Sequence, residues 1–373
     1  MKETSTEEGV PQGDEAAGDK VNIKPFLRLM SEKRASDLFF TPFAPVKIKI
    51  EGTIYPVNKQ VLRPDTVRQI AHSLMTPEQL ELFNENLEID FAISEPGLGR
   101  YRAAIFHQRG YPAIVLRYIA VEPPLLENLG APPVLADLVM MKRGLILMVG
   151  STGSGKSTTL AGMINHRNLT ASDHILTVED PIEFVHAHQG CLVNQREIGA
   201  DTRSFARALK YALREDPDVV LIGEMRDHET IAAGLTIAET GHLVLATLHT
   251  NGAAEAIHRI IDVFPSHQQS QVRTQLASVL EGVVTQALLP RASGAGRVAA
   301  AEVLVVTPAI RALIRDDKVH QIQSMMQSGR KFGMQTMTDA LAQLVQAGLV
   351  SATEALRVAG DPDELQRLIG RGG

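Results

Sequence analysis

Residues 150–157 place three glycines, a lysine and several hydroxyl side chains at a fixed spacing, Gly-Ser-Thr-Gly-Ser-Gly-Lys-Ser. Glycines permit a sharp turn and leave no Cβ atoms in the path of a ligand. Backbone N–H groups at the start of a following helix attract an anion. The ammonium of Lys156 can reach phosphate oxygens, and the hydroxyl of Ser157 can bind Mg²⁺. The pattern therefore predicts a phosphate-binding loop, or P-loop.

The segments on either side of this loop agree with that prediction. The apolar run Leu145–Val149 predicts a buried strand, and Thr158–Asn165 is compatible with a helix. A P-loop requires this strand–loop–helix context, so a glycine-rich turn without a ligand is the weaker interpretation. The expected nucleotide-binding residues are Gly150, Ser151, Thr152, Gly153, Ser154, Gly155, Lys156, Ser157 and Thr158.

Two further stretches place carboxylates just after predicted strands. Asp218–Glu224 is an apolar strand that ends in an acid, and ligands of parallel sheets bind beyond the carboxyl ends of the strands. Glu224 is therefore expected at the metal with Ser157, whereas Asp218 precedes the strand and is expected to serve structure. The segment Glu179–Glu183 contains three acids, one of which can act as a general base on water. A solvated charged loop is the alternative for that segment.

Two histidines flank the predicted strand Leu243–Thr247. His242 and His249 are seven residues apart with no cysteine nearby, which does not match a zinc site. An odd offset also places them on opposite faces of an unbroken strand. His249 follows the strand and is expected near the nucleotide, whereas His242 precedes it and is expected at the far end of the sheet.

Four arginines lie in or near two predicted strands of the N-terminal part of the chain. Arg100 and Arg102 share a face at period two, and Arg109 and Arg117 follow. Arginine binds phosphate bidentately. Since these residues are far in sequence from the P-loop, a role at the nucleotide requires closure between domains or supply to a neighbouring subunit. An ordinary surface role is the alternative for each of them.

The chain has 373 residues, of which 44% are hydrophobic and 21% charged, as in soluble globular proteins. From residue 143 buried strands alternate with helices, which predicts a parallel sheet covered on both faces. We expect five segments: a disordered acidic tail at 1–20, an α/β domain at 21–121, a proline-containing linker at 122–142, a core at 143–300 and a helical region at 301–373.

Composition excludes several classes of protein. The single cysteine, Cys191, cannot form an internal disulfide, which is typical of a reducing cytosolic compartment. No window approaches the ~18 apolar residues of a membrane span. With 37 basic and 43 acidic residues, the net charge is -6, which disfavours a nucleic-acid binder or DNA motor.

Four motifs in order resemble the PilT/PilU family of type IV pilus retraction ATPases, within the secretion ATPase superfamily. They are GSTGSGKST (Walker A), ILTVEDPIEF (aspartate box), DVVLIGEMRD (Walker B, with Glu224 in place of the usual Asp) and GHLVLATLHT (histidine box). The resemblance covers about residues 24–360. The stretches FLRLMSEKRASDLFF, MINHRN and HAHQGCLVNQREIG are more similar to the PilU branch, and TPAIRALIRD to the PilT branch. The chain as a whole resembles the PilU branch more closely.

The resemblance implies an N-terminal PAS-like α/β domain, a RecA-like P-loop NTPase core with a helical C-terminal part, and a homohexameric ring. It implies that Glu183 is the catalytic glutamate and that Glu224 acts at the metal. It also implies that His242 and His249 contact or sense the γ-phosphate side. Arginines of the N-terminal domain are implied at the nucleotide, and the candidates are Arg100, Arg102, Arg109 and Arg117.

The function implied by the resemblance is ATP hydrolysis, with ATP and Mg²⁺ bound, coupled to retraction of a type IV pilus. The protein would act in the cytoplasm at the inner face of the inner membrane, through a platform protein of that membrane. One alternative is an accessory nucleotide-binding subunit that works with a second retraction ATPase. Another is a related secretion-type ATPase.

Overall fold

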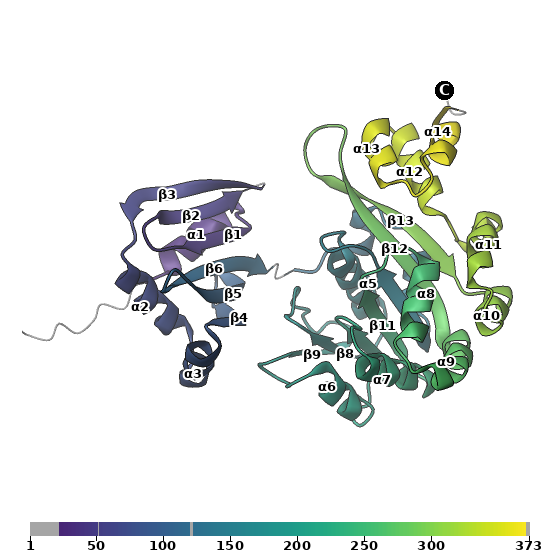
Figure 1. The fold of residues 1–373 in the computed structure, drawn as a ribbon, viewed down its shortest axis with the longest axis horizontal. Helices are drawn as coiled ribbons and strands as arrows, with labels where there is room; N and C mark the ends of the chain where they lie inside the picture. The colour runs from purple at the N-terminus through teal and green to yellow at the C-terminus, as the bar shows by residue number, and fades with distance from the viewer. Residues whose placement is uncertain (1–21, 51, 120–121, 371–373) are drawn as a thin grey trace, which may run out of the picture. The chain divides into compact units, whose positions relative to one another are not determined.

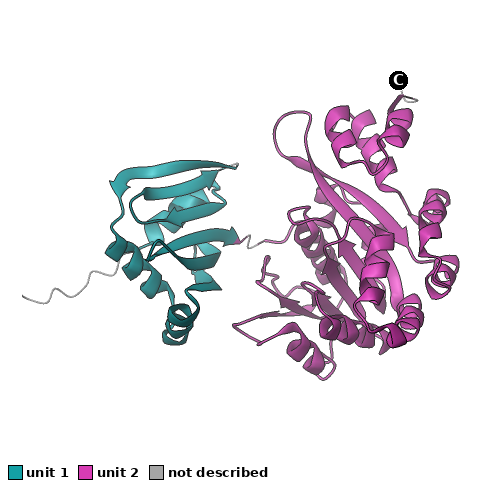
Figure 2. Ribbon diagram, viewed as in Figure 1, with its two compact units in different colours: residues 1–118 teal, residues 119–373 magenta. Residues whose placement is uncertain are grey.

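The computed structural model describes residues 22–50, 52–119 and 122–370. The acidic tail predicted at 1–20 lies outside the described residues. The chain divides into two compact units, residues 1–118 and residues 119–373 (Figures 1 and 2).

Unit 1 is built on a six-stranded sheet with the strand order β3-β2-β1-β6-β5-β4. In Pro45–Ile50 the side chains of Val46 and Ile48 are buried and alternate with more exposed residues, as period-two patterning predicts. The elements are α1 (Lys24–Lys33), β1 (Asp37–Phe40), β2 (Pro45–Ile50), β3 (Thr53–Val61), α2 (Pro64–Leu74), α3 (Pro77–Asn86), β4 (Glu88–Glu95), β5 (Gly99–Gln108) and β6 (Tyr111–Ile119).

Residues 67–83 belong to two helices, α2 and α3, rather than to one. Pro77 opens α3, and the residue before a proline is disfavoured in helical conformation. Thr76 adopts an extended conformation and caps α3 by accepting from the backbone N–H of Gln79. The Gln79 side chain accepts from the Thr76 N–H in return. This capping box starts a new helix where hydrophobic periodicity indicated none.

Unit 2 contains a seven-stranded sheet with the order β13-β12-β7-β11-β10-β8-β9. Neighbouring strands from β12 to β9 are parallel, and β13 pairs with β12 in the antiparallel direction. The first elements are η1 (Leu126–Leu129), α4 (Val134–Val139), β7 (Gly144–Val149), α5 (Lys156–Thr170), β8 (His174–Glu179), β9 (Leu192–Glu197), α6 (Phe205–Ala212), β10 (Val219–Ile222), α7 (His228–Glu239) and β11 (Leu243–Leu248).

Helices cover both faces of this sheet (Figure 1). All residues of β7, β10 and β11 are buried. Leu145 and Leu147 of β7 belong to the core under α6 to α9, whereas Ile146 and Met148 belong to the core under α4 and α5. The predicted parallel sheet with two covered faces is confirmed. Two further helices, α8 (Ala253–Asp262) and α9 (Ser266–Val279), also pack against this sheet.

The sheet continues past residue 300, where the sequence predicted a change to helices. The long strands β12 (Leu280–Pro290) and β13 (Arg297–Val305) form a hairpin, so β13 crosses that position. The remaining elements are α10 (Pro308–Arg315), η2 (Val319–Gln321), α11 (Ile322–Ser328), η3 (Arg330–Phe332), α12 (Met337–Gln346), α13 (Ala352–Val358) and α14 (Pro362–Gly370). Across the described part of the chain, no helix combines the length and apolar character that a bilayer crossing requires.

Candidate active site

Four parallel strands of unit 2 end at the same edge of the sheet, and the loops after them line one pocket. The P-loop, residues 150–157, follows β7, and Glu224 follows β10. His249 follows β11, and the segment of residues 180–186, which we call the Glu183 loop, follows β8. This is the edge at which parallel sheets bind ligands. The lining includes Thr152, Gly153, Lys156, Ser157, Glu179, Asp180, Glu183, His186, Glu224, Arg226 and His249.

The P-loop has the backbone that its glycines predict. Gly150, Gly153 and Gly155 have φ angles of 142°, 80° and 89°, a region that residues with a side chain rarely adopt. Space also requires glycine, because a Cβ atom at Gly150 would lie 2.4 Å from the carbonyl oxygen of Gln286. Helix α5 begins at Lys156, so the last two residues of the P-loop form the start of the helix.

Lys156 is buried, and its ammonium points back over the P-loop. Its Nζ donates to the carbonyl oxygens of Gly150 at 2.7 Å and Ser151 at 3.0 Å. Burial lowers the pKa of Lys156, while the charges of Glu224 and Glu183 act to raise it. An anionic ligand would stabilise the charged form of this buried ammonium, because the carbonyl oxygens around it carry no net negative charge.

His249 connects this lysine to Glu224. Its Nδ1 lies 3.5 Å from Lys156 Nζ, and its Nε2 lies 3.2 Å from a carboxylate oxygen of Glu224. An imidazole that accepts at Nδ1 and donates from Nε2 satisfies both contacts. Arg226 binds the other oxygen of Glu224 at 2.6 Å. Burial acts to raise the pKa of Glu224, but the hydrogen bond from Arg226 and the charge of His249 outweigh it and lower that pKa.

The three acids after β8 have different surroundings. Glu179 accepts from Thr177 Oγ1 at 2.7 Å, from Gln195 Nε2 at 3.2 Å and from the N–H of Glu183 at 3.4 Å. Burial raises its pKa, although these hydrogen bonds act in the opposite direction. Asp180 and Glu183 are exposed and also line the pocket. Glu183 is therefore available to a ligand, whereas Glu179 is engaged in holding the loop.

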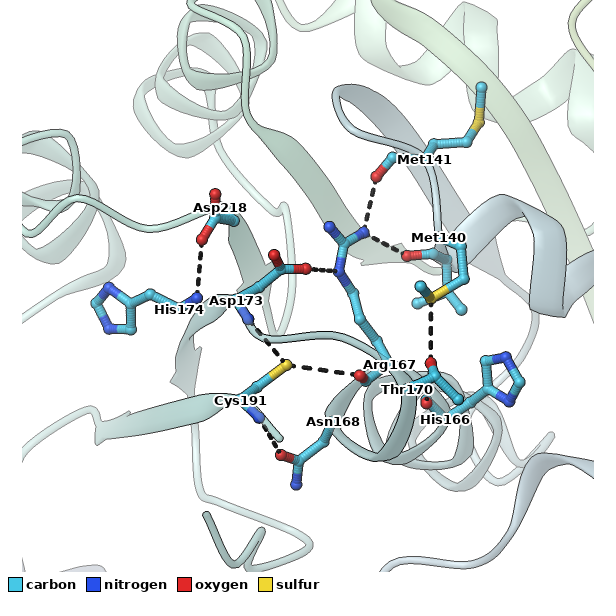
Figure 3. A network of polar contacts seen from close by, with 11 residues as sticks. Met140, Met141, His166, Arg167, Asn168, Thr170, Asp173, His174, Cys191 and Asp218 are labelled. Carbon is cyan, nitrogen blue, oxygen red and sulfur yellow. Dashed lines mark hydrogen bonds and ion pairs between the residues drawn. The ribbon is translucent and has the colours of Figure 1, made fainter. Parts of the chain in front are cut away.

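The P-loop helix is also anchored at its far end, by a polar network that Figure 3 shows. The side chain of Arg167 donates to Asp173 at 2.7 Å and to the carbonyls of Val139 and Met141 at 2.6 and 2.7 Å. Cys191 contacts the Arg167 carbonyl through Sγ at 3.5 Å. These contacts fix the C-terminal end of α5 to the end of α4 and to the segment before β9. The helix that follows the P-loop is therefore held at the end far from the pocket.

A nucleotide and a divalent cation fit the donor set of this pocket. The start of α5 offers backbone N–H groups, and Lys156 offers a cation for phosphate oxygens. Ser157 and Glu224 both line the pocket and have the oxygen ligands that Mg²⁺ prefers,. Among the described residues no cluster of three or more His, Cys, Asp or Glu side chains is arranged to hold a metal by itself. The site therefore matches a metal shared between protein and phosphate oxygens.

Some predicted site residues lie elsewhere. His242 precedes β11 at the opposite end of the sheet, where its Nδ1 contacts the Ile237 carbonyl and Thr240 Oγ1, each at 3.1 Å. Gly150 and Ser151 line a second cavity, together with residues that include Thr285 and Glu302. Asp218 accepts from the backbone N–H of His174 at 2.8 Å, a structural contact of the kind the sequence indicated.

The four predicted arginines belong to unit 1, whereas the residues that line the pocket belong to unit 2. Arg102 binds Asp90, and Arg117 binds Asp37 at 2.8 Å. Arg100 contacts Ser94 at 3.5 Å. Arg109 lies between β5 and β6 with a φ of 50°. A role for these arginines at a nucleotide stays a prediction.

Sequence reasoning missed Gln286, a buried residue of β12 that supports the P-loop. Its Oε1 accepts from Thr159 Oγ1 and its Nε2 donates to the Ser154 carbonyl, both at 2.8 Å. No local signal marks this role, because Gln286 is 132 residues from Ser154. Arg226 was also missed as a partner of Glu224, although it lies two residues away in the same motif.

The chain matches the family model described as "Type II/IV secretion system protein" over residues 18–295. The chain belongs to that family. The family assignment agrees with the P-loop and with the strand that leads into Glu224, and it makes the chain an ATPase of mixed α/β fold, as predicted.

Similar members of the family are pilus ATPases. "Type IV pilus ATPase PilU" of Pseudomonas aeruginosa is 45% identical over 349 residues, which cover 94% of this chain and 91% of PilU. The retraction ATPase PilT of the same organism is 45% identical over 343 residues, which cover 92% of this chain and 99% of PilT. The crystal structure of the pilus retraction motor PilT with bound ADP has a TM-score of 0.85 at 46% identity, and the match covers 91% of this chain and 98% of that one.

These similarities confirm the resemblance to the PilT/PilU type of type IV pilus ATPase that the four motifs indicated. The two sequence identities are equal, so identity alone assigns the chain to neither branch.

Proposed function

We propose that the chain is an ATP-driven motor for retraction of type IV pili. The observation that supports it most is the convergence of Lys156, His249, Glu224 and the Glu183 loop on one pocket. A phosphate bound at the start of α5 would contact groups from four strand ends at once. Loss or movement of the terminal phosphate would then change contacts in several of the loops that line the pocket.

Each residue has a role in this proposal. Lys156 binds the phosphate oxygens, and Ser157 and Glu224 hold Mg²⁺, which neutralises charge on the phosphates when it is bound. The exposed Glu183 orients the attacking water and takes its proton while oxygen bonds to the γ-phosphorus and the bond to the β-phosphate oxygen breaks. His249, between Lys156 and Glu224, senses whether the terminal phosphate is present.

The remaining parts of the proposal concern assembly and place. The chain works as a homohexamer in the cytoplasm, at the inner face of the inner membrane, against a platform protein of that membrane. Arg100, Arg102, Arg109 and Arg117 are the candidates for supplying positive charge to a nucleotide, within one subunit or to its neighbour. A ligand that is held between two domains biases their closure, which is the motion a motor needs.

The test combines turnover and motility. The purified full chain should hydrolyse ATP, and its gene should restore twitching to a piliated bacterium that lacks its own retraction ATPases. Lys156→Ala should fail in both assays. Turnover with motility restored only alongside a second, PilT-type ATPase would instead establish the accessory role. If the chain hydrolyses no ATP, either alone or alongside a second, PilT-type ATPase, the proposed motor function is contradicted.

A further inference from the structure

The Glu183 loop is held in place by side chains of the two strands that flank it in sequence. The backbone N–H of Ile182 donates to Glu197 at 3.1 Å, and the N–H of Glu183 donates to Glu179 at 3.4 Å. Further along the loop, the backbone of Phe184 and His186 is bonded by Gln195. The position of the Glu183 side chain therefore depends on side chains of β8 and β9 that lie outside the loop itself.

Gln195 makes the largest number of these contacts. Its Oε1 accepts from the His186 N–H at 2.7 Å. Its Nε2 donates to the Phe184 carbonyl at 2.8 Å and to the Glu179 carboxylate at 3.2 Å. The amide of Gln195 therefore bonds to Glu179 before Glu183 and to Phe184 and His186 after it. Glu179 also accepts a hydrogen bond from the Glu183 N–H. Only an amide side chain of this length offers one acceptor and two donors at the same point.

Strand register explains why β9 can do this. β9 is the edge strand, and it pairs in parallel with β8 so that Gln195 lies opposite Thr177 and Glu197 opposite Glu179. Residues two apart on a strand share a face, so Gln195 and Glu197 both reach the Glu183 loop. Asn194 and Arg196 alternate with these residues and belong to the other face, where Asn194 contacts His174 at 2.9 Å,.

We propose that Gln195 is a positioning residue for Glu183, through which the edge strand β9 sets the rate of water attack. The proposal rests on the base role of Glu183 proposed above. Gln195 does not line the pocket, so nucleotide binding at the P-loop should not need it. Loss of the amide lets the loop move, and a displacement of about 1 Å at a reacting group is enough to slow a reaction by about 100-fold.

The test uses Gln195→Met in the full chain, which keeps the length of the side chain and removes all three hydrogen bonds. We expect kcat to fall by roughly 10- to 100-fold, while the Kd for a fluorescent ATP analogue and the KM for ATP stay near their wild-type values. Gln195→Asn retains the amide but is one methylene shorter, so it should show the same split if Gln195→Met does not fold. Asn194→Ala is the matched control on the opposite face of β9, and it should leave kcat unchanged.

A double-mutant cycle separates positioning from a general structural role. In the Glu183→Gln background, adding Gln195→Met should cause little further loss of single-turnover rate, because the group that it positions is already gone. Losses that multiply would overturn the proposal, and so would a wild-type kcat in Gln195→Met. If Glu183→Gln itself turns over at the wild-type rate, the proposed base fails and the inference falls with it. The inference alone fails when Glu183→Gln is inactive and Gln195→Met is fully active.

Discussion

The P-loop and the Glu183 loop line the same pocket, but different kinds of contact hold them. The P-loop takes its shape mainly from its own glycines, three of which have φ angles between 80° and 142°. The Glu183 loop takes its shape from side chains of Glu179, Gln195 and Glu197, which bond to its backbone. The first loop is therefore encoded by consecutive residues, and the second by residues up to 15 positions away.

This difference implies that the two loops should fail differently when they are mutated. Damage to the P-loop should reduce binding and turnover together, because the phosphate contacts are lost in both the ground state and the transition state. Damage to the Glu183 loop should reduce turnover alone. The following predictions use that split and run from the largest expected effect to the smallest.

The largest effects should come from the central residue of each loop. Lys156→Ala should lower ATP turnover by about 1000-fold, because it removes the charge beside the phosphates, and it should weaken nucleotide binding as well. Glu183→Gln should lower turnover by about 100-fold or more while binding stays intact. Steady-state ATPase rates and titration with a fluorescent ATP analogue measure both. Wild-type turnover in Glu183→Gln would move the base to Glu179 or Asp180.

A smaller effect should come from Gln286, the support of the P-loop. Gln286→Leu removes the bonds to Thr159 and the Ser154 carbonyl and leaves a buried carbonyl unpaired, which costs about 1–3 kcal/mol. Nucleotide affinity should fall by about 10-fold, the equivalent of 1.4 kcal/mol. Gln275→Leu on α9 is a matched control. Unchanged affinity in Gln286→Leu would show that the glycines suffice to shape the P-loop.

The two histidines should differ in the same assay. His249→Ala removes the link between Lys156 and Glu224, and turnover should fall by about 10-fold, as for loss of one hydrogen bond to a charged group. His242→Ala at the other end of β11 should change turnover by no more than about twofold, as for a surface substitution. A larger effect from His242→Ala would show that the far end of the sheet also acts on the nucleotide.

The last prediction concerns the stability of the chain rather than turnover, because the contribution of the buried His186 should depend on pH. Burial lowers the pKa of His186 from 6.5 to about 4. The unfolded chain then binds a proton at a higher pH than the folded chain, so the stabilisation present above pH 6.5 is lost as the pH falls towards 4. At 1.36 kcal/mol for each pKa unit, the loss is on the order of 3 kcal/mol. His186→Leu should flatten the fall of the thermal midpoint over this range, whereas His267→Leu on the exposed face of α9 should not. If the thermal midpoints of the wild type and of His186→Leu fall in parallel with pH, His186 is not the source of this pH dependence.

Much of the site was predictable because its residues are adjacent in sequence. The P-loop, the strand that leads to Glu224 and the acids after β8 are each a short continuous pattern, and parallel strands bring their carboxyl ends to one edge. The positions of His242 before the predicted strand and His249 after it also indicated their separation, and in the structure they lie at opposite ends of β11.

The rest was not predictable from local pattern. The polar capping box of Thr76 and Gln79 marks the break between α2 and α3. Hydrophobic periodicity does not reveal such a break, because it depends only on the apolar residues. β13 extends the sheet beyond residue 300, because it pairs along its length with β12. Long-range pairing is decided by the partner strand as much as by the strand itself.

The sequence by itself predicted a phosphate-binding loop beyond the end of a buried strand, since glycine, lysine and serine at that spacing have few other uses. Only the tertiary structure decided which side chains hold the two loops of the pocket. Gln286 and Gln195 are amides without a distinctive neighbourhood in sequence, and they gain their roles because strand order and register bring them against backbone groups that need a partner. A hydrogen bond depends on distance and direction in space, which a linear pattern specifies only for residues that are close along the chain.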